Sequence, residues 1–379
     1  MQSTRKYLAV LAVVFTPACA GDPMPTAPAL GDASAIEAQD TRFAGDRDVT
    51  VMTQNLYVGA DVDAVITALA TPDPTDDIPA LLDAVATIER TDFPTRARAI
   101  ALQVKQRRPE VIGLQEVSTI GVDIPPLGVS VHLDFQQILL DALAAEGLDY
   151  VVAVRLDNFT ASPAPGISLT DADVMLVDPS RVEVVSAAGH TFQANLGVVA
   201  PGVDLQRGWV SMNATVGGRP YTFVSTHTEG TGPAELLLQL HALQIGEMVA
   251  SLGAASPVIA MGDFNSEPGT PAYQAMLDGG FTDVWHALRP GVRGFTCCHL
   301  ADLSNRTSVL HERIDYVWTR GLGDARGPHS LQGQVSLYGE VPSDRIRNSA
   351  GQLIWPADHA GVIANLMLGR GSHHSIASR

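Results

Sequence analysis

Short apolar runs that each stop at a polar residue recur along the chain, and residues 258–261 form the clearest of them. This run ends at Gly262, and Asp263 and Asn265 follow. An apolar run bounded by turn-forming residues is typical of a buried strand, and glycine allows the backbone to change direction at its end. Because Asp263 and Asn265 are two residues apart, an extended backbone turns both side chains the same way. The pattern predicts a buried strand that presents an acid and an amide at its end.

The same pattern predicts two strands earlier in the chain. Residues 49–57 alternate apolar and polar positions and predict a first strand with Asn55 near its end. Residues 111–117 predict an apolar strand that ends at Glu116. A carboxylate at the end of a buried strand is costly unless it is paired or bound to a metal ion. Apolar residues at helical spacing predict helices over 95–106 and 135–148, and a third that opens at 230–233.

Two hairpins are predicted from turn residues between apolar runs. The first joins 174–177 to 182–185, and the second joins 208–216 to 219–226 across Gly217-Gly218 and delivers His227. The polar stretch 157–173 is predicted to be a surface loop.

Two more strands are predicted near the C-terminal end of the chain. Residues 313–318 carry Asp315 near the start of the first one. Asp358 and His359 directly precede the second, residues 362–368. Each predicted strand therefore begins or ends beside a polar residue that is able to do chemistry.

The composition fits a globular protein, and the net charge limits the kinds of partner that it is expected to bind. Of the 379 residues, 46% are hydrophobic and 17% are charged, and the net charge is −17. This negative charge argues against tight, non-specific binding to nucleic acid, which depends on Lys and Arg contacts to phosphate. A nuclease that acts through a metal ion is still compatible with it, because the ion supplies local positive charge.

The N-terminal residues predict an export signal. Residues 1–20 combine a basic start with an apolar stretch, residues 7–15, that is too short to span a bilayer. Two outcomes stay open: cleavage near Cys19 and release into the periplasm or medium, or lipidation of Cys19 and anchoring as a lipoprotein. Residues 21–46 are rich in Pro, Ala, Gly and Asp and predict a disordered linker. We expect one domain over 47–369, a loose tail over 370–379, and a monomer without an obligate protein partner.

Adjacent cysteines occur at Cys297 and Cys298. In an oxidising compartment they are able to form a vicinal disulfide, and buried thiols are the alternative. The segment that carries them is predicted to be a loop near the edge of the site.

Six motifs carry a resemblance to a known family. TQNL, LQEV, STHTE, GDFNSEP, RIDYVW and ADHAGV occur in this order between residues 49 and 368. They resemble the endonuclease/exonuclease/phosphatase superfamily, here an exported bacterial member, which includes deoxyribonuclease I, bacterial sphingomyelinases and inositol polyphosphate 5-phosphatases. The resemblance implies a four-layer α/β sandwich in which two mixed sheets pack face to face with helices outside. It also implies a site at one edge of the sandwich and hydrolysis of a phosphate ester with Mg²⁺ or Mn²⁺.

The resemblance also implies roles for residues near the metal ion. Glu116 is the main metal ligand, which suits a hard cation. Asn55 lies beside the metal or the phosphate, and Asp358 completes the metal shell. Arg207 is expected to contact a substrate phosphate, with a surface position as the alternative.

The remaining motif residues are implied to act on water and phosphate. Asp263 orients or deprotonates the attacking water, and Asn265 bonds the water or a phosphoryl oxygen. His359 contacts the scissile phosphate as general base or stabiliser, and Asp315 accepts a hydrogen bond from its ring. His227 stabilises charge in the transition state.

The sequence leaves the substrate open among nucleic acids, phospholipid head groups and small phosphorylated metabolites. A phosphodiesterase is the favoured activity. The alternative from another class is a catalytically silent family member that serves as a binding module. Loss of Glu116, Asp263 or His359 would mark that alternative, and all three are present.

Overall fold

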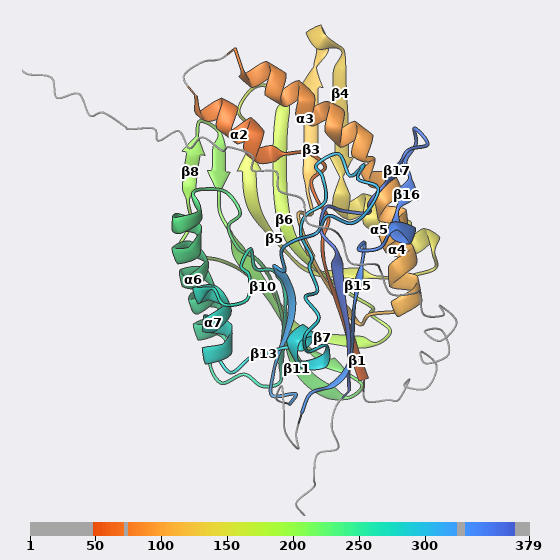
Figure 1. Cartoon of the computed structure of the whole chain (residues 1–379), viewed down its shortest axis with the longest axis vertical. Helices are drawn as coiled ribbons and strands as arrows, with labels where there is room; N and C mark the ends of the chain where they lie inside the picture. The colour runs from red at the N-terminus through yellow and green to blue at the C-terminus, as the bar shows by residue number, and fades with distance from the viewer. Residues whose placement is uncertain (1–47, 72–74, 324–329, 368–379) are drawn as a thin grey trace, which may run out of the picture. The chain divides into compact units, whose positions relative to one another are not determined.

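The computed structural model describes residues 48–71, 75–323 and 330–367 (Figure 1). The predicted signal peptide with Cys19, the linker over 21–46 and the tail over 370–379 lie outside the described residues. Among the helices of the described ranges, none has the length and apolar character needed to cross a membrane.

Two β-sheets form the centre of the described chain (Figure 1). In spatial order, the larger sheet contains β15 (Gln332–Tyr338), β18 (Gly361–Met367), β1 (Asp48–Asn55), β2 (Val111–Gln115), β6 (Ile167–Val177), β5 (Val151–Ala161), β9 (Val203–Leu205) and β8 (Gly197–Ala200), with β3 (Thr119–Ile124) beside β6 and β4 (Val129–Asp134) beside β3. The smaller sheet contains β13 (Thr282–Asp283), β14 (Asp315–Arg320), β12 (Val258–Asp263), β11 (Arg219–His227), β10 (Gly208–Val216) and β7 (Val182–Thr191). Both sheets are mixed, because β1 is parallel to β2 and β11 is parallel to β12.

Helices cover the outer face of each sheet. The larger sheet packs against α3 (Asp77–Thr91), α4 (Phe93–Arg107) and α5 (Phe135–Ala145), with α2 (Val62–Ala70) over its β5–β9 end. The smaller sheet packs against α6 (Ala234–Ser251) and α7 (Pro271–Asp278). Shorter elements are α8 (Val284–Leu288), the 3₁₀ turns Pro125–Leu127 and Pro342–Asp344, and the small pair β16 (Ile346–Arg347) and β17 (Leu353–Ile354).

Alternation along the central strands explains the layers. In β12, Ile259 and Met261 join the core between the two sheets, whereas Val258 and Ala260 face the helices α6 and α7. A strand that is buried on both faces reads as a continuous apolar run, which is the pattern seen in the sequence. The predicted four-layer α/β sandwich is therefore confirmed.

Two local predictions about the middle of the chain are wrong. Residues 157–173 are largely strand, since β5 extends to Ala161 and β6 begins at Ile167. The strands on either side of the turn at 178–181 do not pair as a hairpin, because β6 pairs within the larger sheet and β7 pairs with β10 in the smaller one. The turn carries the chain from one sheet to the other. The second predicted hairpin, β10–β11, is confirmed, with Gly217 and Gly218 at φ of 55° and 75°.

The topology gathers six strand termini at one edge of the sandwich. β1 and β2 are parallel, so Asn55 lies opposite Gln115 and next to the position of Glu116. β11 and β12 are parallel as well, so His227 lies opposite Asp263. β14 and β18 run antiparallel to their neighbours and therefore start at this edge, where Asp315 pairs with Asp263 and Val362 pairs with Thr53.

A buried arginine on α4 holds the loops at this edge. The side chain of Arg96 is fully buried and donates hydrogen bonds to the carbonyl oxygens of Leu56, Tyr57, Thr91 and Pro356. The carbonyls of Leu56 and Tyr57 belong to the loop that follows Asn55, that of Pro356 to the loop that precedes Asp358, and that of Thr91 to the end of α3. Arg96 therefore fixes two chain segments that carry predicted site residues.

Arg96→Met is expected to lower the free energy of unfolding by about 2–4 kcal/mol, because it leaves several buried carbonyl oxygens without donors. Urea unfolding followed by circular dichroism measures the change. Arg98→Met, on the exposed face of the same helix, is the matched control and is expected to change stability by less than about 0.5 kcal/mol. Equal effects of the two substitutions would contradict the anchoring role of Arg96.

Candidate active site

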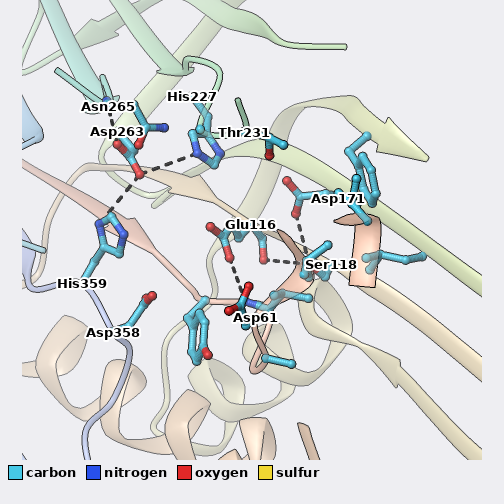
Figure 2. Close-up of a pocket in the computed structure, with 18 of the residues that line it drawn as sticks. Asp61, Glu116, Ser118, Asp171, His227, Thr231, Asp263, Asn265, Asp358 and His359 are labelled. Carbon is cyan, nitrogen blue, oxygen red and sulfur yellow. Dashed lines mark hydrogen bonds and ion pairs between the residues drawn. The ribbon is translucent and has the colours of Figure 1, made fainter. Parts of the chain in front are cut away.

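A pocket of about 300 Å³ opens at the edge where the strand termini meet. Figure 2 shows its lining side chains converging from both sheets. Most of the residues predicted from the sequence line it, namely Glu116, Arg207, His227, Asp263, Asn265, Asp358 and His359. Asn55 and Asp315 are not part of the lining; they lie behind it and hydrogen-bond to lining residues.

Asn55 joins the two carboxylates on which the predicted chemistry depends. Its Nδ2 donates to Glu116 Oε1 at 3.0 Å and to Asp263 Oδ2 at 3.1 Å, and its Oδ1 accepts from the backbone N–H of Tyr57. Glu116 Oε2 accepts from the backbone N–H of Val58 at 2.8 Å. Glu116 also has a φ of 53°, an uncommon conformation for a residue other than glycine. The contacts and backbone together fix the direction of the Glu116 carboxylate.

Asp263 lies between two histidines. Its Oδ2 is 3.6 Å from Nε2 of His227 and 3.7 Å from Nδ1 of His359, and its Oδ1 accepts from the backbone N–H of Asn265 at 2.9 Å. Burial, together with the nearby charge of Asp315, raises the pKa of Asp263 to about 7. The carboxyl group therefore titrates near neutral pH.

His359 forms a hydrogen-bonded pair with Asp315. The Nδ1–H of His359 donates to Asp315 Oδ2 at 2.8 Å, so the other ring nitrogen, Nε2, points away from Asp315. Burial alone lowers the pKa of His359, but the charges of Asp315, Asp358 and Asp263 outweigh it and hold the pKa well above its usual value. His359 is thus an imidazolium cation at neutral pH.

His227 is held in the opposite charge state. Burial, followed by the charge of Arg207, lowers the pKa of His227 well below its usual value. Nη1 of Arg207 lies 3.2 Å from Nδ1 of His227. Since arginine has only donors, Nδ1 must be the acceptor, and the proton of the neutral ring is on Nε2, which faces Asp263.

Arg207 is buried at the base of the pocket, so the surface position considered from the sequence is wrong. It is 9% exposed, and its guanidinium group lies near Asp171 Oδ2 at 3.5 Å and Glu229 Oε1 at 3.7 Å as well as His227. The predicted contact with a substrate phosphate remains a prediction.

Asp171, in β6, is a pocket residue that the sequence interpretation missed. Its Oδ1 accepts from Ser118 Oγ at 3.1 Å, and burial, followed by the charge of Glu116, raises its pKa to about 7. The residue was overlooked because its segment was interpreted as a loop. The alternation of Ile167 and Leu169 with polar neighbours, leading into the apolar run 174–177, is the signal that could have revealed the strand.

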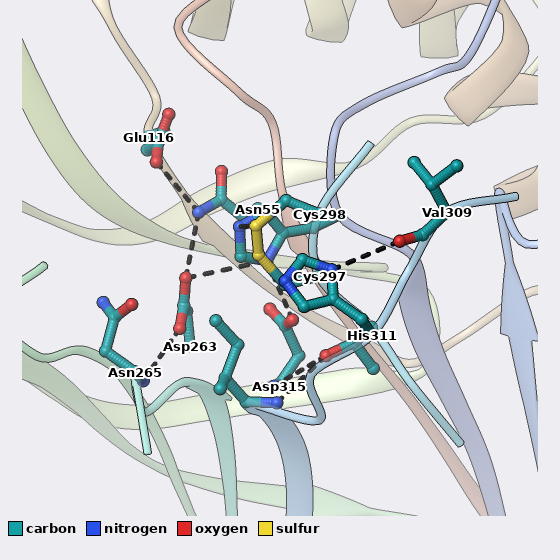
Figure 3. The surroundings of a disulfide bond; sticks show 12 residues. Asn55, Glu116, Asp263, Asn265, Cys297, Cys298, Val309, His311 and Asp315 are labelled. Atoms are coloured by element: carbon teal, nitrogen blue, oxygen red, sulfur yellow. Dashed lines mark hydrogen bonds and ion pairs between the residues drawn. A yellow bond between two sulfur atoms is a disulfide. The ribbon is translucent and has the colours of Figure 1, made fainter. Parts of the chain in front are cut away.

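A disulfide lies directly beside His359. Figure 3 shows Cys297 bonded to Cys298, as one of the two sequence interpretations predicted, and Cys298 Sγ is 3.9 Å from His359 Nε2. The surrounding segment ties the strand starts together. Thr296 accepts from the backbone N–H groups of Asp315, through Oγ1, and of Ala360, through its carbonyl oxygen.

The oxygen ligands of the pocket fit a hard divalent cation. Asp61, Glu116, Asp171, Asp263 and Asp358 all line it, and Asp358 Oδ1 is buried with no hydrogen-bond partner in the described part of the chain. Burial raises the pKa of Asp358 to about 7. The charge of His359 lowers this pKa, and the charge of Glu116 raises it. Carboxylate oxygens are the ligands that Mg²⁺ prefers, so Glu116 and Asp358 are the residues best placed to hold it.

Two acids and a histidine form another group whose ligand atoms lie close together. Atoms of Asp263, Asp315 and His359 lie within 4.8 Å of one another. However, Nδ1 of His359 carries the proton that bonds Asp315, so this nitrogen has no lone pair for a metal ion. We interpret these three residues as a hydrogen-bonded His359–Asp315 pair with the Asp263 carboxyl beside it, 3.7 Å from His359 Nδ1.

In EDTA, stability is expected to rise by on the order of 1 kcal/mol as the pH falls from 8.5 to 7. Asp171, Asp263 and Asp358 have folded-state pKa values of about 7 against an ordinary value of 3.8. The folded state therefore binds more protons than the unfolded state in this range, and its stability falls as the pH rises. His359, whose pKa is held well above its usual value, adds to the change in the same direction, so the figure for the three carboxyl groups is a lower bound. The histidines with lowered pKa values oppose this trend only near and below about pH 6.5.

Differential scanning calorimetry in EDTA and in Mg²⁺ tests this dependence. Because a cation binds the deprotonated carboxylates, Mg²⁺ is expected to raise the melting temperature more at pH 8.5 than at pH 7. A melting temperature in EDTA that is flat or rises with pH over this range would contradict the raised pKa values.

Comparison with known proteins agrees with this geometry. The profile of the Endonuclease/Exonuclease/phosphatase family matches residues 52–359. A family protein from Beutenbergia cavernae is similar at 20% identity and a TM-score of 0.54, covering 85% of this chain and 72% of that one. A family protein from Bacteroides thetaiotaomicron is similar at 16% identity and a TM-score of 0.52, covering 85% of this chain and 98% of that one. These two likenesses show the fold alone.

No curated protein sequence matches the chain significantly. The family match nevertheless extends from β1 to His359 and so includes every site residue predicted from the sequence, from Asn55 to His359. The chain therefore belongs to the endonuclease/exonuclease/phosphatase family, as its motifs predicted.

Proposed function

We propose that this protein is a hydrolase of phosphate esters, most directly a phosphodiesterase, that requires Mg²⁺ or Mn²⁺. The observation that carries the proposal is one pocket in which an imidazolium, a neutral histidine and several carboxylates converge. The carboxylates alone would repel an anionic phosphate, so the pocket suits this substrate when a divalent cation is bound. Such an ion would polarise a phosphoryl oxygen and offset the charge that develops there.

Glu116 and Asp358 are the proposed ligands of that cation. Asn55 supports them from behind, because its amide group holds Glu116 next to Asp263. Asn55 is therefore a positioning residue in this proposal.

Asp263 is the proposed general base. A base whose pKa lies near the working pH combines the correct protonation state with a useful driving force, and the pKa of Asp263 is about 7. Asn265 would orient the attacking water: its Nδ2 is fixed by Thr228 O at 3.0 Å, and its Oδ1 is able to accept a hydrogen bond from the water.

The two histidines are the proposed donors to the phosphoryl group. His359 is positively charged and has its Nδ1–H engaged by Asp315, so its Nε2–H would bind an anionic oxygen. His227 is neutral with its proton on Nε2 and would act as a second donor. The charged state of His359 favours the role of stabiliser and leaves that of base to Asp263.

A hydrolysis panel tests this function. Purified mature protein is incubated with plasmid DNA, RNA, sphingomyelin, inositol phosphates or bis-p-nitrophenyl phosphate, with Mg²⁺, Mn²⁺ or EDTA. We expect metal-dependent cleavage that EDTA stops. Absence of turnover across the panel, in folded protein, would overturn the proposal and favour the binding-module alternative.

We also propose that the protein is exported. The support is the basic and apolar pattern of residues 1–20 and the paired cysteines, which are typical of oxidising compartments. Cell fractionation of the wild type and of Cys19→Ser distinguishes a lipid anchor, which the substitution removes, from free secretion. Retention of both proteins in the cytoplasm would contradict export.

A further inference from the structure

A second cavity of about 80 Å³ lies under the helices α2 and α3. From α2, Val62 and Ile66 line it; from α3, Leu81, Val85 and Ile88 do. Its floor is formed by strands of the larger sheet, with Ile167 and Leu169 from β6. The cavity is thus enclosed mainly by apolar side chains.

This apolar cavity adjoins the active-site pocket and shares part of its lining. Val58, Ala60, Val62, Ile66, Phe159 and Leu169 line both. The shared wall begins at the proposed metal ligand, because the backbone N–H of Val58 donates to Glu116 Oε2 at 2.8 Å. A molecule bound at the carboxylates therefore has an apolar space directly beside it.

Strand register explains why the polar and apolar parts adjoin. On β6, Ile167, Leu169 and Asp171 alternate onto one face, and two residues of a strand span about 6.6 Å. Phe159 of β5 is the register partner of both Asp171 and Leu205 of β9, and Ala161 is that of Leu169. Side chains two residues apart on these strands therefore line the acidic pocket in one case and the apolar cavity in the next.

We infer that the substrate is a phosphate ester with an unbranched alkyl chain, and that this chain occupies the apolar cavity. The inference rests on the proposed function and specifies its substrate class. An apolar cavity of about 150 Å³ holds benzene in another protein, so about 80 Å³ suits a chain of a few carbons rather than a ring. A sugar or nucleoside here would bury hydroxyl groups without partners, which is costly.

Mixed diesters of p-nitrophenol test the inference, because they share one leaving group and differ only in the retained alcohol. The methyl, butyl and hexyl esters are compared with the ester of thymidine 5′-phosphate in Mg²⁺. Burying a methylene group gives up to about a fourfold gain in affinity. We expect kcat/KM to rise at least about tenfold from methyl to butyl, and the thymidine ester to fall below butyl. Equal values for methyl, butyl and hexyl would overturn the inference.

Filling the cavity provides a matched test. Ala84 on α3 lines the cavity, whereas Ala86 on the same helix is exposed. Ala84→Leu is expected to bring the butyl-to-methyl ratio of kcat/KM close to one while it leaves the methyl ester unaffected. Ala86→Leu is expected to keep the wild-type ratio. An unchanged ratio in folded Ala84→Leu would contradict binding at this cavity.

Calorimetric binding of dimethyl and dibutyl phosphate in Mg²⁺ separates this inference from the proposed function. If dibutyl phosphate binds more tightly than dimethyl phosphate and Ala84→Leu removes the difference, the alkyl site is supported, whether or not any ester is hydrolysed. Absence of hydrolysis together with this binding result would overturn the proposed function alone. Hydrolysis of the methyl ester with no dependence of binding or rate on chain length supports the function and overturns the alkyl site.

Discussion

Replacing Glu116 with glutamine is expected to lower kcat/KM for phosphate-ester hydrolysis by at least about a thousandfold. The substitution keeps the size of the side chain and leaves one amide oxygen that can accept from the Val58 N–H, but it removes the negative charge that a cation requires. Two measurements apply: steady-state kinetics, and the rise in melting temperature on adding Mg²⁺, which we expect to shrink.

Glu89→Gln is the control for this substitution, since Glu89 is exposed on α3 and we expect wild-type kinetics. Circular dichroism establishes that both variants are folded. Full activity of folded Glu116→Gln would show that Glu116 is not the metal ligand.

Substitution of His359 by alanine is expected to have a comparable effect, a loss of about a thousandfold or more in kcat. It removes the cation that faces the pocket and leaves Asp315, which is 3% exposed, without the partner that balances its charge. Kinetics of His359→Ala and Asp315→Asn over pH 5 to 9 measure the two contributions. We expect Asp315→Asn to retain more activity and to lower the pKa of His359, which removes activity as the pH rises.

His311→Ala is the matched control, because His311 is an exposed histidine near the disulfide (Figure 3). Its kinetics are expected to equal those of the wild type. A His359→Ala variant that keeps its kcat, with a normal circular dichroism spectrum, would remove His359 from the proposed mechanism.

The sequence by itself determined the elements that are buried on both faces, and through its motifs it determined the fold. The runs at 111–117 and 258–261 were recognised as strands because both of their faces pack, against helices on one side and the other sheet on the opposite side. The predicted site residues were found for a related reason. A charged or imidazole side chain at the end of a predicted strand is conspicuous in a sequence, and Glu116, His227 and Asp263 all lie at or next to a strand end.

Strand pairing was decided only by the tertiary structure. The turn at 178–181 has the same local sequence signal whether the chain folds back on itself or crosses to the other sheet, and here it crosses. Asp171 was hidden for a similar reason, because β6 is polar where it passes the pocket and apolar elsewhere. A local pattern contains no information about which distant strand lies opposite.

The charge states of the site also depend on tertiary contacts. His227 ends one strand and His359 precedes another, yet burial next to Arg207 keeps one neutral, and three carboxylates keep the other charged. The same holds for the apolar cavity, which requires α2 and α3 to lie over β5, β6 and β9. The residue type determines which group can bind a proton, but the pKa of that group depends on neighbours that are far away in the sequence.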